Sequence, residues 1–201
     1  MTNQLKITLG MNSIPESVEC VTSVADPDYP ENWLYHKVIV TTSSQAGVIF
    51  KHKLPSNHFS HVFVDECAQI IEPETLIPIS LCDMTNGVVV LAGDHKQLGP
   101  VVQSTKAEKY GLDCSLMERL MENFDCYDRK DIFQNSGYYD PKFVVKLINN
   151  HRSDGQIMAI PSRLFYNNEL KFLTKTDEKL LDSVGLKSPV NFYGVDGLST
   201  T

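Results

Sequence analysis

The chain has 201 residues, of which 42% are hydrophobic and 21% are charged, and its formal net charge is −7. This length is sufficient for one or two domains with a buried core. The acidic balance excludes a broad basic surface for nucleic acid, so RNA contacts would need a local groove of hydroxyl and backbone groups.

The cysteine pattern and the hydropathy of the chain predict a soluble, non-secreted protein of the cytoplasm. The five cysteines form no Cys-x-x-Cys pair and have no histidine partners at zinc-binding spacing, which is typical of reduced intracellular thiols. The first residues contain no apolar signal-peptide core, and no apolar stretch approaches the roughly 20 residues that span a bilayer. We therefore expect no membrane partner.

Apolar runs in the first half of the chain predict three strands. Residues 1–36 contain several prolines and are expected to be irregular, with little helix. The predicted strands are 37–41, 61–65 and 87–92. Between the last two, acidic residues around Pro73 are typical of the first turn of a helix, which Pro78 should kink or end early. A strand, a helix and a strand in this order predict one βαβ unit of a parallel sheet.

Helical patterns prevail after residue 100. Ser115 can cap a helix in which apolar residues recur at a spacing of four and form a core stripe. The stripe consists of Leu116, Leu120 and Phe124, and the residues that should face away from it are Glu118, Arg119 and Glu122. Residues 125–142 are rich in charged and turn-forming residues, which predicts a surface linker at a domain boundary.

A second domain is expected to start after this linker. Residues 143–148 should begin its sheet. Ser153 and Asp154 can cap the helix that follows, in which Pro161 should introduce a distortion. The apolar residues of this helix are Ile157, Ile160 and Leu164.

Acidic and polar side chains follow two of the predicted strands. Asp65 and Glu66 come at the end of the second strand, and Gln97 follows the third within a Gly-Asp-x-x-Gln-Leu-x-Pro segment. Parallel strands bring such side chains to their carboxyl ends. Hydrolysis of a phosphoanhydride needs a carboxylate for hydrated magnesium, a group that activates water and a polar contact to the terminal phosphate. These three residues suit those roles in that order, although an apolar run ending in Asp-Glu also occurs by chance.

Paired hydroxyl residues end the first predicted strand. Thr41 and Thr42 could bond the phosphate oxygens of a nucleic acid without reading bases. Threonines are also common in strands simply because β-branched residues favour them. Both interpretations stay open from the residues alone.

Five segments, in the same order, resemble motifs of the Upf1-like superfamily 1 RNA helicases. Residues 65–74 are similar to motif II, 93–100 to motif III, 147–153 to motif IV, 160–166 to the segment after motif IV, and 38–47 to motif Ic. The Tyr-Tyr-Asp-Pro-Lys-Phe segment at 138–143 favours the branch of Armitage and the Moloney leukemia virus 10 protein.

The resemblance implies an α/β fold with the RecA-like parallel sheet of a P-loop NTPase helicase core. Residues 37–124 would be the latter part of a first RecA-like domain, and residues 143–201 the start of a second. The implied activity is ATP-dependent, 5′ to 3′ unwinding or translocation on single-stranded RNA, in RNA silencing or RNA turnover. Ribonucleoprotein or silencing proteins are the implied partners, and ribonucleoprotein granules of the cytoplasm are an implied location.

The resemblance also implies roles for individual residues. Asp65 would hold Mg²⁺ through water, Glu66 would activate the attacking water and Gln97 would sense the terminal phosphate of ATP. Arg152 would complete the site as an arginine finger, unless it is an ordinary salt-bridge arginine. The further nucleotide contacts would be Gln69, which could instead cap the following turn, and Asp94, and the RNA contacts would be Thr41, Thr42 and Pro100.

A phosphate-binding loop is not found in the sequence. None of the eleven glycines is followed by lysine, whereas such a loop needs Gly-Lys-Ser or Gly-Lys-Thr to wrap the nucleotide phosphates. Motifs V and VI are not found either. Two hypotheses follow: the chain is part of an active helicase and is inactive alone, or it is a non-hydrolysing, helicase-derived module that binds RNA or a protein.

Overall fold

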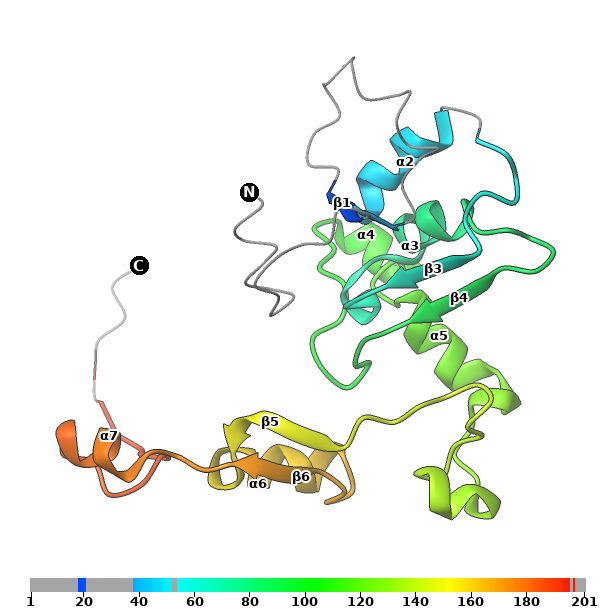
Figure 1. The fold of residues 1–201 in the computed structure, drawn as a ribbon. Coiled ribbons are helices and arrows are strands. Elements are labelled where there is room, and N and C mark those ends of the chain that lie inside the picture. The colour runs from blue at the N-terminus through cyan, green and yellow to red at the C-terminus, as the bar shows by residue number, and fades with distance from the viewer. Residues whose placement is uncertain (1–17, 21–37, 52–53, 196, 198–201) are drawn as a thin grey trace. The chain divides into compact units, whose positions relative to one another are not determined.

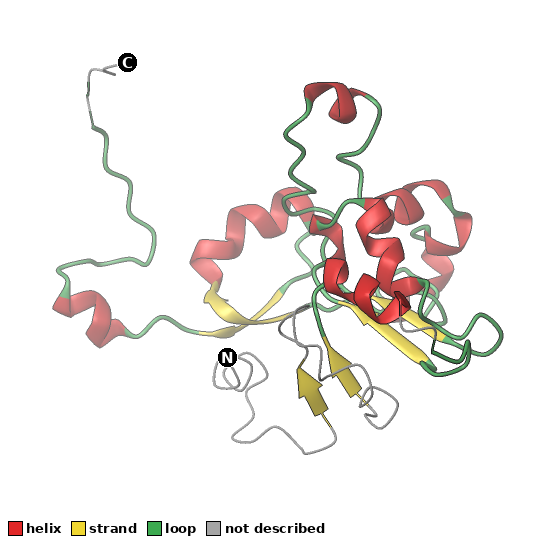
Figure 2. Cartoon of the chain, turned by 90° about the horizontal axis from the view of Figure 1, so that it is seen from above, coloured by secondary structure: helices red, strands yellow, loops and turns green. Residues whose placement is uncertain are grey.

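The structure is a computed structural model that describes residues 18–20, 38–51, 54–195 and 197 (Figure 1). The chain divides into two compact units, Met1–Asp125 and Cys126–Thr201. The strands of the described residues occur as three parallel pairs, which makes this an α/β chain (Figure 2).

A parallel βαβ unit is the centre of the first unit. Strand β3 (His61–Val64) pairs with β4 (Val88–Leu91) along its whole length, with His61 opposite Val88 and Val64 opposite Leu91. Helix α3 (Glu72–Ile79) lies between them in the sequence. It has a proline in its first turn and ends one residue after Pro78, so both predicted proline effects are confirmed.

A second strand pair precedes this βαβ unit. Strand β2 (Val38–Val40) pairs in parallel with β1 (Val18–Cys20). The prediction that residues 1–36 are irregular is therefore wrong for Val18–Cys20, and the remainder of that segment lies outside the described residues. Helix α2 (Ser43–Lys51) follows β2 and packs against α3, where the Ser44 hydroxyl donates a hydrogen bond to Glu74.

Two capped helices complete the first unit. Helix α4 (Thr105–Lys109) is capped by Ser104, and α5 (Leu116–Asn123) by Ser115, whose Oγ accepts from the Glu118 N–H at 3.1 Å. The predicted core stripe is only partly correct: Leu116 is buried, but the helix ends before Phe124, which is 44% exposed. Phe124 does not join the core because the helix ends at Asn123 and the helical spacing stops there.

Part of the buried core of the first unit is formed by the segment that follows β3. The 3₁₀ helix η2 (Cys67–Gln69) follows that strand and packs against α5. Cys67, Thr75 and Ser115 are the largest fully buried side chains of the described residues. The residues around Asp65 and Glu66 thus have a rigid support.

The second unit contains two 3₁₀ helices and a strand–helix–strand segment. The 3₁₀ helices are η3 (Asp125–Tyr127), which spans the division, and η4 (Asp131–Ser136); the other elements are β5 (Asn149–Asp154), α6 (Gly155–Phe165), β6 (Lys171–Thr174) and α7 (Glu178–Ser183). Strands β5 and β6 are parallel, with a register shift between Asn150 and Asp154. Asp154 caps α6, as expected, and its carboxylate also accepts from the Thr176 N–H at 2.8 Å.

The prediction that residues 143–148 begin the second sheet is wrong. Residues 143–148 form no strand; β5 begins at Asn149, and only the carbonyl of Ile148 joins the ladder, by accepting from the Lys171 N–H at 2.8 Å. Five of its six residues are apolar, but Val145 and Leu147 are 79% and 86% exposed. A strand-like pattern forms a ladder only where a partner strand lies beside it.

No helix in the described part of the chain combines the length and the apolar character that a membrane span requires.

Candidate nucleotide site

The two acidic residues of the predicted site lie where β3 ends. Val64 is buried, and Asp65 and Glu66 are exposed immediately after it. Glu66 has a φ of 51° and a ψ of 32°, the left-handed region, and its N–H donates to the Asp65 carboxylate at 3.0 Å. A left-handed residue other than glycine is uncommon and often belongs to a functional site. This turn ends strand β3 at Val64.

The carboxylates are tied to β4 by the backbone. Beyond the strand pair, the Ala92 N–H donates to the Val64 carbonyl at 2.8 Å, and the Cys67 N–H donates to the Ala92 carbonyl at 2.9 Å. These bonds continue the parallel ladder past both strand ends. They hold residues 65–67 beside residues 92–93, so the predicted motifs II and III are neighbours.

Gly93 permits this close approach. A Cβ at this position would lie 3.1 Å from the Ala68 nitrogen and 3.2 Å from the Cys67 nitrogen. Both distances are shorter than ordinary contacts of a side chain with backbone atoms. Any larger residue would therefore push the segment after Glu66 away from the end of β4.

Polar contacts orient the remaining predicted nucleotide residues. The Gln97 side-chain amide donates to the Asp94 carboxylate at 2.8 Å, and the Lys96 N–H donates to the same carboxylate at 3.0 Å. The Gln69 amide donates to the Glu66 carboxylate at 3.3 Å. Glu66 and Asp94 therefore each have a side-chain amide partner from the same motif. The structure brings together Asp65, Glu66, Gln69, Asp94 and Gln97 at one edge of the strand pair.

A hollow of about 350 Å³ lies next to these residues. Its lining residues are Ala68, His95, Gln97, Leu98, Gly99, Pro100, Val102, Glu108, Asp113, Cys114 and Glu118. Pro100, which the resemblance assigns to RNA, is buried here. His95 is half-buried, and burial together with the nearby Lys96 charge lowers its pKa from the ordinary value.

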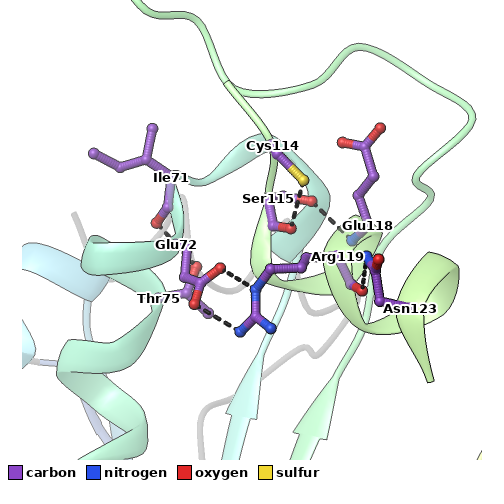
Figure 3. A network of polar contacts seen from close by, with 8 residues as sticks. All are labelled: Ile71, Glu72, Thr75, Cys114, Ser115, Glu118, Arg119 and Asn123. Carbon is purple, nitrogen blue, oxygen red and sulfur yellow. Dashed lines mark hydrogen bonds and ion pairs between the residues drawn. The ribbon is translucent and has the colours of Figure 1, made fainter. Parts of the chain in front are cut away.

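An ion pair joins the end of motif II to α5 (Figure 3). Arg119 donates from Nε and Nη2 to the two Glu72 oxygens at 2.6 and 2.7 Å, and Ile71 pairs with Ser115 in an isolated antiparallel bridge. The hydrogen bond from Arg119 holds the pKa of Glu72 below its usual value. Arg119 lies off the apolar stripe and its side chain is 42% exposed, but its guanidinium also reaches back to α3, a contact that the helical pattern does not predict. No spacing rule connects residues so far apart, so no sequence pattern predicts this pair.

Cys67 is a structural residue next to the carboxylates. It is fully buried, and its thiol lies 3.6 Å from the Met117 sulfur. Burial raises the pKa of the Cys67 thiol to about 11. Since the thiolate is the reactive form, Cys67 is expected to be inert near neutral pH.

The two threonines have different surroundings. The Thr42 hydroxyl accepts from the Gln45 N–H at 3.3 Å at the start of α2, and Thr42 is exposed. The Thr41 hydroxyl is buried and, among the described residues, has no hydrogen-bond partner. Thr42 is therefore the more accessible of the two predicted RNA contacts.

Arg152 belongs to the second unit, whereas the other predicted catalytic residues belong to the first. It lies in β5 and is exposed, and its N–H donates to the Asn150 side chain at 2.9 Å. The surroundings of Arg152 are therefore given only within the second unit.

The site offers oxygen donors that suit magnesium. Asp65 and Glu66 are adjacent, exposed carboxylates, and Mg²⁺ is typically bound by one or two carboxylates together with water and substrate phosphates. Within the described residues, no cluster of three or more histidine, cysteine, aspartate or glutamate side chains could hold a metal by itself.

The chain is similar in sequence to several known helicases. A family model described as an AAA domain matches residues 30–105. The chain is 42% identical to RNA helicase Mov10l1 of Mus musculus over 168 residues, which is 80% of the chain and 14% of that protein. It is 44% identical to the putative helicase mov-10-B.1 of Danio rerio over 142 residues (70% and 14%), and 40% identical to the probable RNA helicase armi of Drosophila melanogaster over 137 residues (67% and 11%). The chain thus spans at most 14% of the length of these relatives.

Proposed function

We propose that this chain carries the hydrolytic carboxylates of an ATP-dependent RNA helicase. The chain belongs to the RNA helicase family of Mov10l1, mov-10 and Armitage, and it corresponds to a segment of these proteins. The observation that supports this proposal best is the meeting of motifs II and III. The Cys67 to Ala92 hydrogen bond and the close approach at Gly93 hold the segment of Asp65 and Glu66 beside residues 92–93, where motif III begins.

Each residue at this edge has a chemical role in the proposal. Bound Mg²⁺ would neutralise charge on the ATP phosphates, and Asp65 would hold its water shell. Glu66 would take a proton from the attacking water. Gln97, oriented by Asp94, would contact the terminal phosphate, and Gln69 would hold the Glu66 carboxylate in position.

Arg152 would act across the two units. Its guanidinium is always charged and planar, and it can stabilise charge that spreads over the phosphoryl oxygens. The role requires the second unit to close on the first when nucleotide is bound. Such closure would couple the nucleotide state to the grip on RNA, in which Thr41, Thr42 and Pro100 are the proposed contacts. Unwinding or translocation would run 5′ to 3′ on single-stranded RNA, as the resemblance implies.

We further propose that these 201 residues do not hydrolyse ATP alone, because they contain no Gly-Lys-Ser or Gly-Lys-Thr phosphate-binding loop. That same feature favours a second candidate function for the isolated polypeptide, a non-hydrolysing module that binds RNA or a partner protein. The presence of Asp65, Glu66, Gln97 and Arg152 together favours the first. Association with ribonucleoprotein or silencing proteins in the cytoplasm belongs to the proposal for the whole helicase.

RNA-stimulated ATP hydrolysis tests the proposal in two settings. The purified chain should show no activity above its Glu66→Gln variant. A chimera in which the chain replaces the matching segment of Mus musculus Mov10l1 should hydrolyse ATP in an RNA-dependent manner, and Glu66→Gln should abolish this activity. A chimera that melts like the parent protein yet is inactive, or that keeps its activity with Glu66→Gln, would refute the assignment. RNA binding by the isolated chain without hydrolysis in the chimera would favour the second candidate.

A further inference from the structure

The predicted linker is attached to the strand pair of the second unit through one carboxylate. Glu169, in the loop between α6 and β6, accepts from Arg129 Nη1 at 2.9 Å and pairs through its other oxygen with Lys146. Arg129 and Lys146 lie before β5, and Glu169 lies just before β6. The Glu169 side chain is only 21% exposed, and that of Lys146 only 19%. Such partly buried ion pairs are screened much less than surface pairs.

Aromatic rings cover the two cations of this cluster. The Arg129 guanidinium carbon lies 3.8 Å from the centroid of the Tyr138 ring, and the Lys146 nitrogen lies 5.9 Å from that of Tyr139. Both distances are within the range of cation–π attraction. Burial alone would raise the pKa of Glu169, but the hydrogen bonds from Lys146 and Arg129 outweigh it and hold that pKa below its usual value.

The backbone between these contacts is closed by its own hydrogen bonds. The Lys130 N–H donates to the Tyr138 carbonyl at 2.7 Å, and the Tyr138 N–H donates to the Phe133 carbonyl at 2.8 Å. Tyr138 has a φ of 72° directly after Gly137 at 75°. A tyrosine adopts this conformation only where its surroundings fix it. Here the stack with Arg129 and the two backbone bonds fix it.

We propose that residues 126–146 are a fixed part of the second unit and that the hinge between the units is confined to Phe124 and Asp125, the residue at which η3 begins. Helix α5 ends at Asn123, where the helical hydrogen bonds of the first unit stop, and Phe124 has extended dihedral angles. The segment that the sequence predicts to be an 18-residue linker, 125–142, is then almost wholly folded. The inference concerns the chain itself and does not depend on ATP hydrolysis.

A short hinge has a consequence for the proposed helicase. Arg152 would move as one body with residues 126–174, so closure would be a rotation about two residues. An 18-residue flexible linker would instead allow many orientations of Arg152, and a correct one would be reached more rarely. This consequence rests on the proposed function, whereas the position of the hinge does not.

Hydrogen–deuterium exchange of the 201-residue chain, without nucleotide, tests the hinge. In the unaltered chain, the amides of Lys130 and Tyr138 should exchange at least about tenfold more slowly than in an unstructured peptide, and those of Phe124 and Asp125 should exchange freely. Glu169→Gln removes the shared charge at nearly constant shape and should accelerate exchange in residues 127–140 about tenfold. Glu178→Gln is the matched control, because it makes the same change at an exposed position in α7 and should leave these amides unaltered.

Three results would overturn the inference. They are free exchange of residues 127–140 in the unaltered chain, unchanged exchange there in Glu169→Gln, and protection of Asp125 equal to that of Tyr138. If Glu169→Gln also exposes the Lys171 amide, the second unit has unfolded, and Arg129→Gln decides instead. That variant keeps the Lys146 pair, so it should accelerate exchange at Lys130 and Tyr138 and leave Lys171 protected; unchanged exchange at Lys130 and Tyr138 would again refute the hinge.

Discussion

Replacing Gly93 with alanine should separate the two halves of the candidate nucleotide site. The added Cβ would lie 3.1 Å from the Ala68 nitrogen and 3.2 Å from the Cys67 nitrogen, so backbone atoms must move by a few tenths of an ångström. The Cys67 N–H to Ala92 carbonyl bond is in the path of that movement. Overpacking of this kind typically costs about 1–3 kcal/mol. For a unit of this size, a loss near 2 kcal/mol corresponds to a fall in Tm of roughly 10 °C.

The assay is thermal unfolding followed by circular dichroism, with hydrogen exchange of the Cys67 amide as a local measurement. Gly47→Ala is the control, because Gly47 lies inside α2 and its added Cβ would meet only the Ile77 side chain, at 3.4 Å. Helix propensity predicts that this second glycine-to-alanine change stabilises the chain by up to about 1 kcal/mol. The two variants should therefore shift Tm in opposite directions. An unchanged Tm and an unchanged Cys67 exchange rate in Gly93→Ala would refute the idea that close packing at Gly93 joins motifs II and III.

Three further predictions concern the support of the site. Ser115→Ala should lower the free energy of unfolding by about 1 kcal/mol in a urea titration, because the buried Ser115 hydroxyl caps α5. Ser104→Ala is the control, since Ser104 caps the short and exposed α4. An equal loss in Ser104→Ala would show that burial of the cap is irrelevant. Arg119→Met should lower Tm by a few degrees at pH 7. Because Arg119 lowers the pKa of Glu72, the pair stabilises the fold above the ordinary glutamate pKa of 4.5. The difference in Tm between the variant and the unaltered chain should vanish as pH falls through the lower folded-state pKa of Glu72. A difference that persists in acid would contradict this reasoning. Iodoacetamide at pH 8 should leave Cys67 unmodified in the folded chain and modify it in urea, since burial raises the pKa of Cys67 to about 11. Mass spectrometry measures the modification, and the half-buried Cys126 provides the comparison for the extent of alkylation.

The local elements were largely predictable from the sequence because their signals are local. Strands β3 and β4, the helix between them and the caps at Ser115 and Asp154 follow from apolar periodicity and from side chains that satisfy helix ends. The meeting of Asp65 and Glu66 with Gln97 was also predictable, since parallel strands carry their following residues to one edge. The roles of these residues in catalysis stay predictions.

Only the tertiary structure decided which distant residues support that edge. The partners of Glu72 and Glu169, the close approach at Gly93 and the folding of the predicted linker join positions with no fixed spacing in the sequence. The apolar segment 143–148 shows the converse, because its composition favours a strand and yet it forms none among the described residues. Sequence patterns report what each segment can form by itself, whereas ion pairs, close packing and sheet ladders depend on which segments the fold brings together.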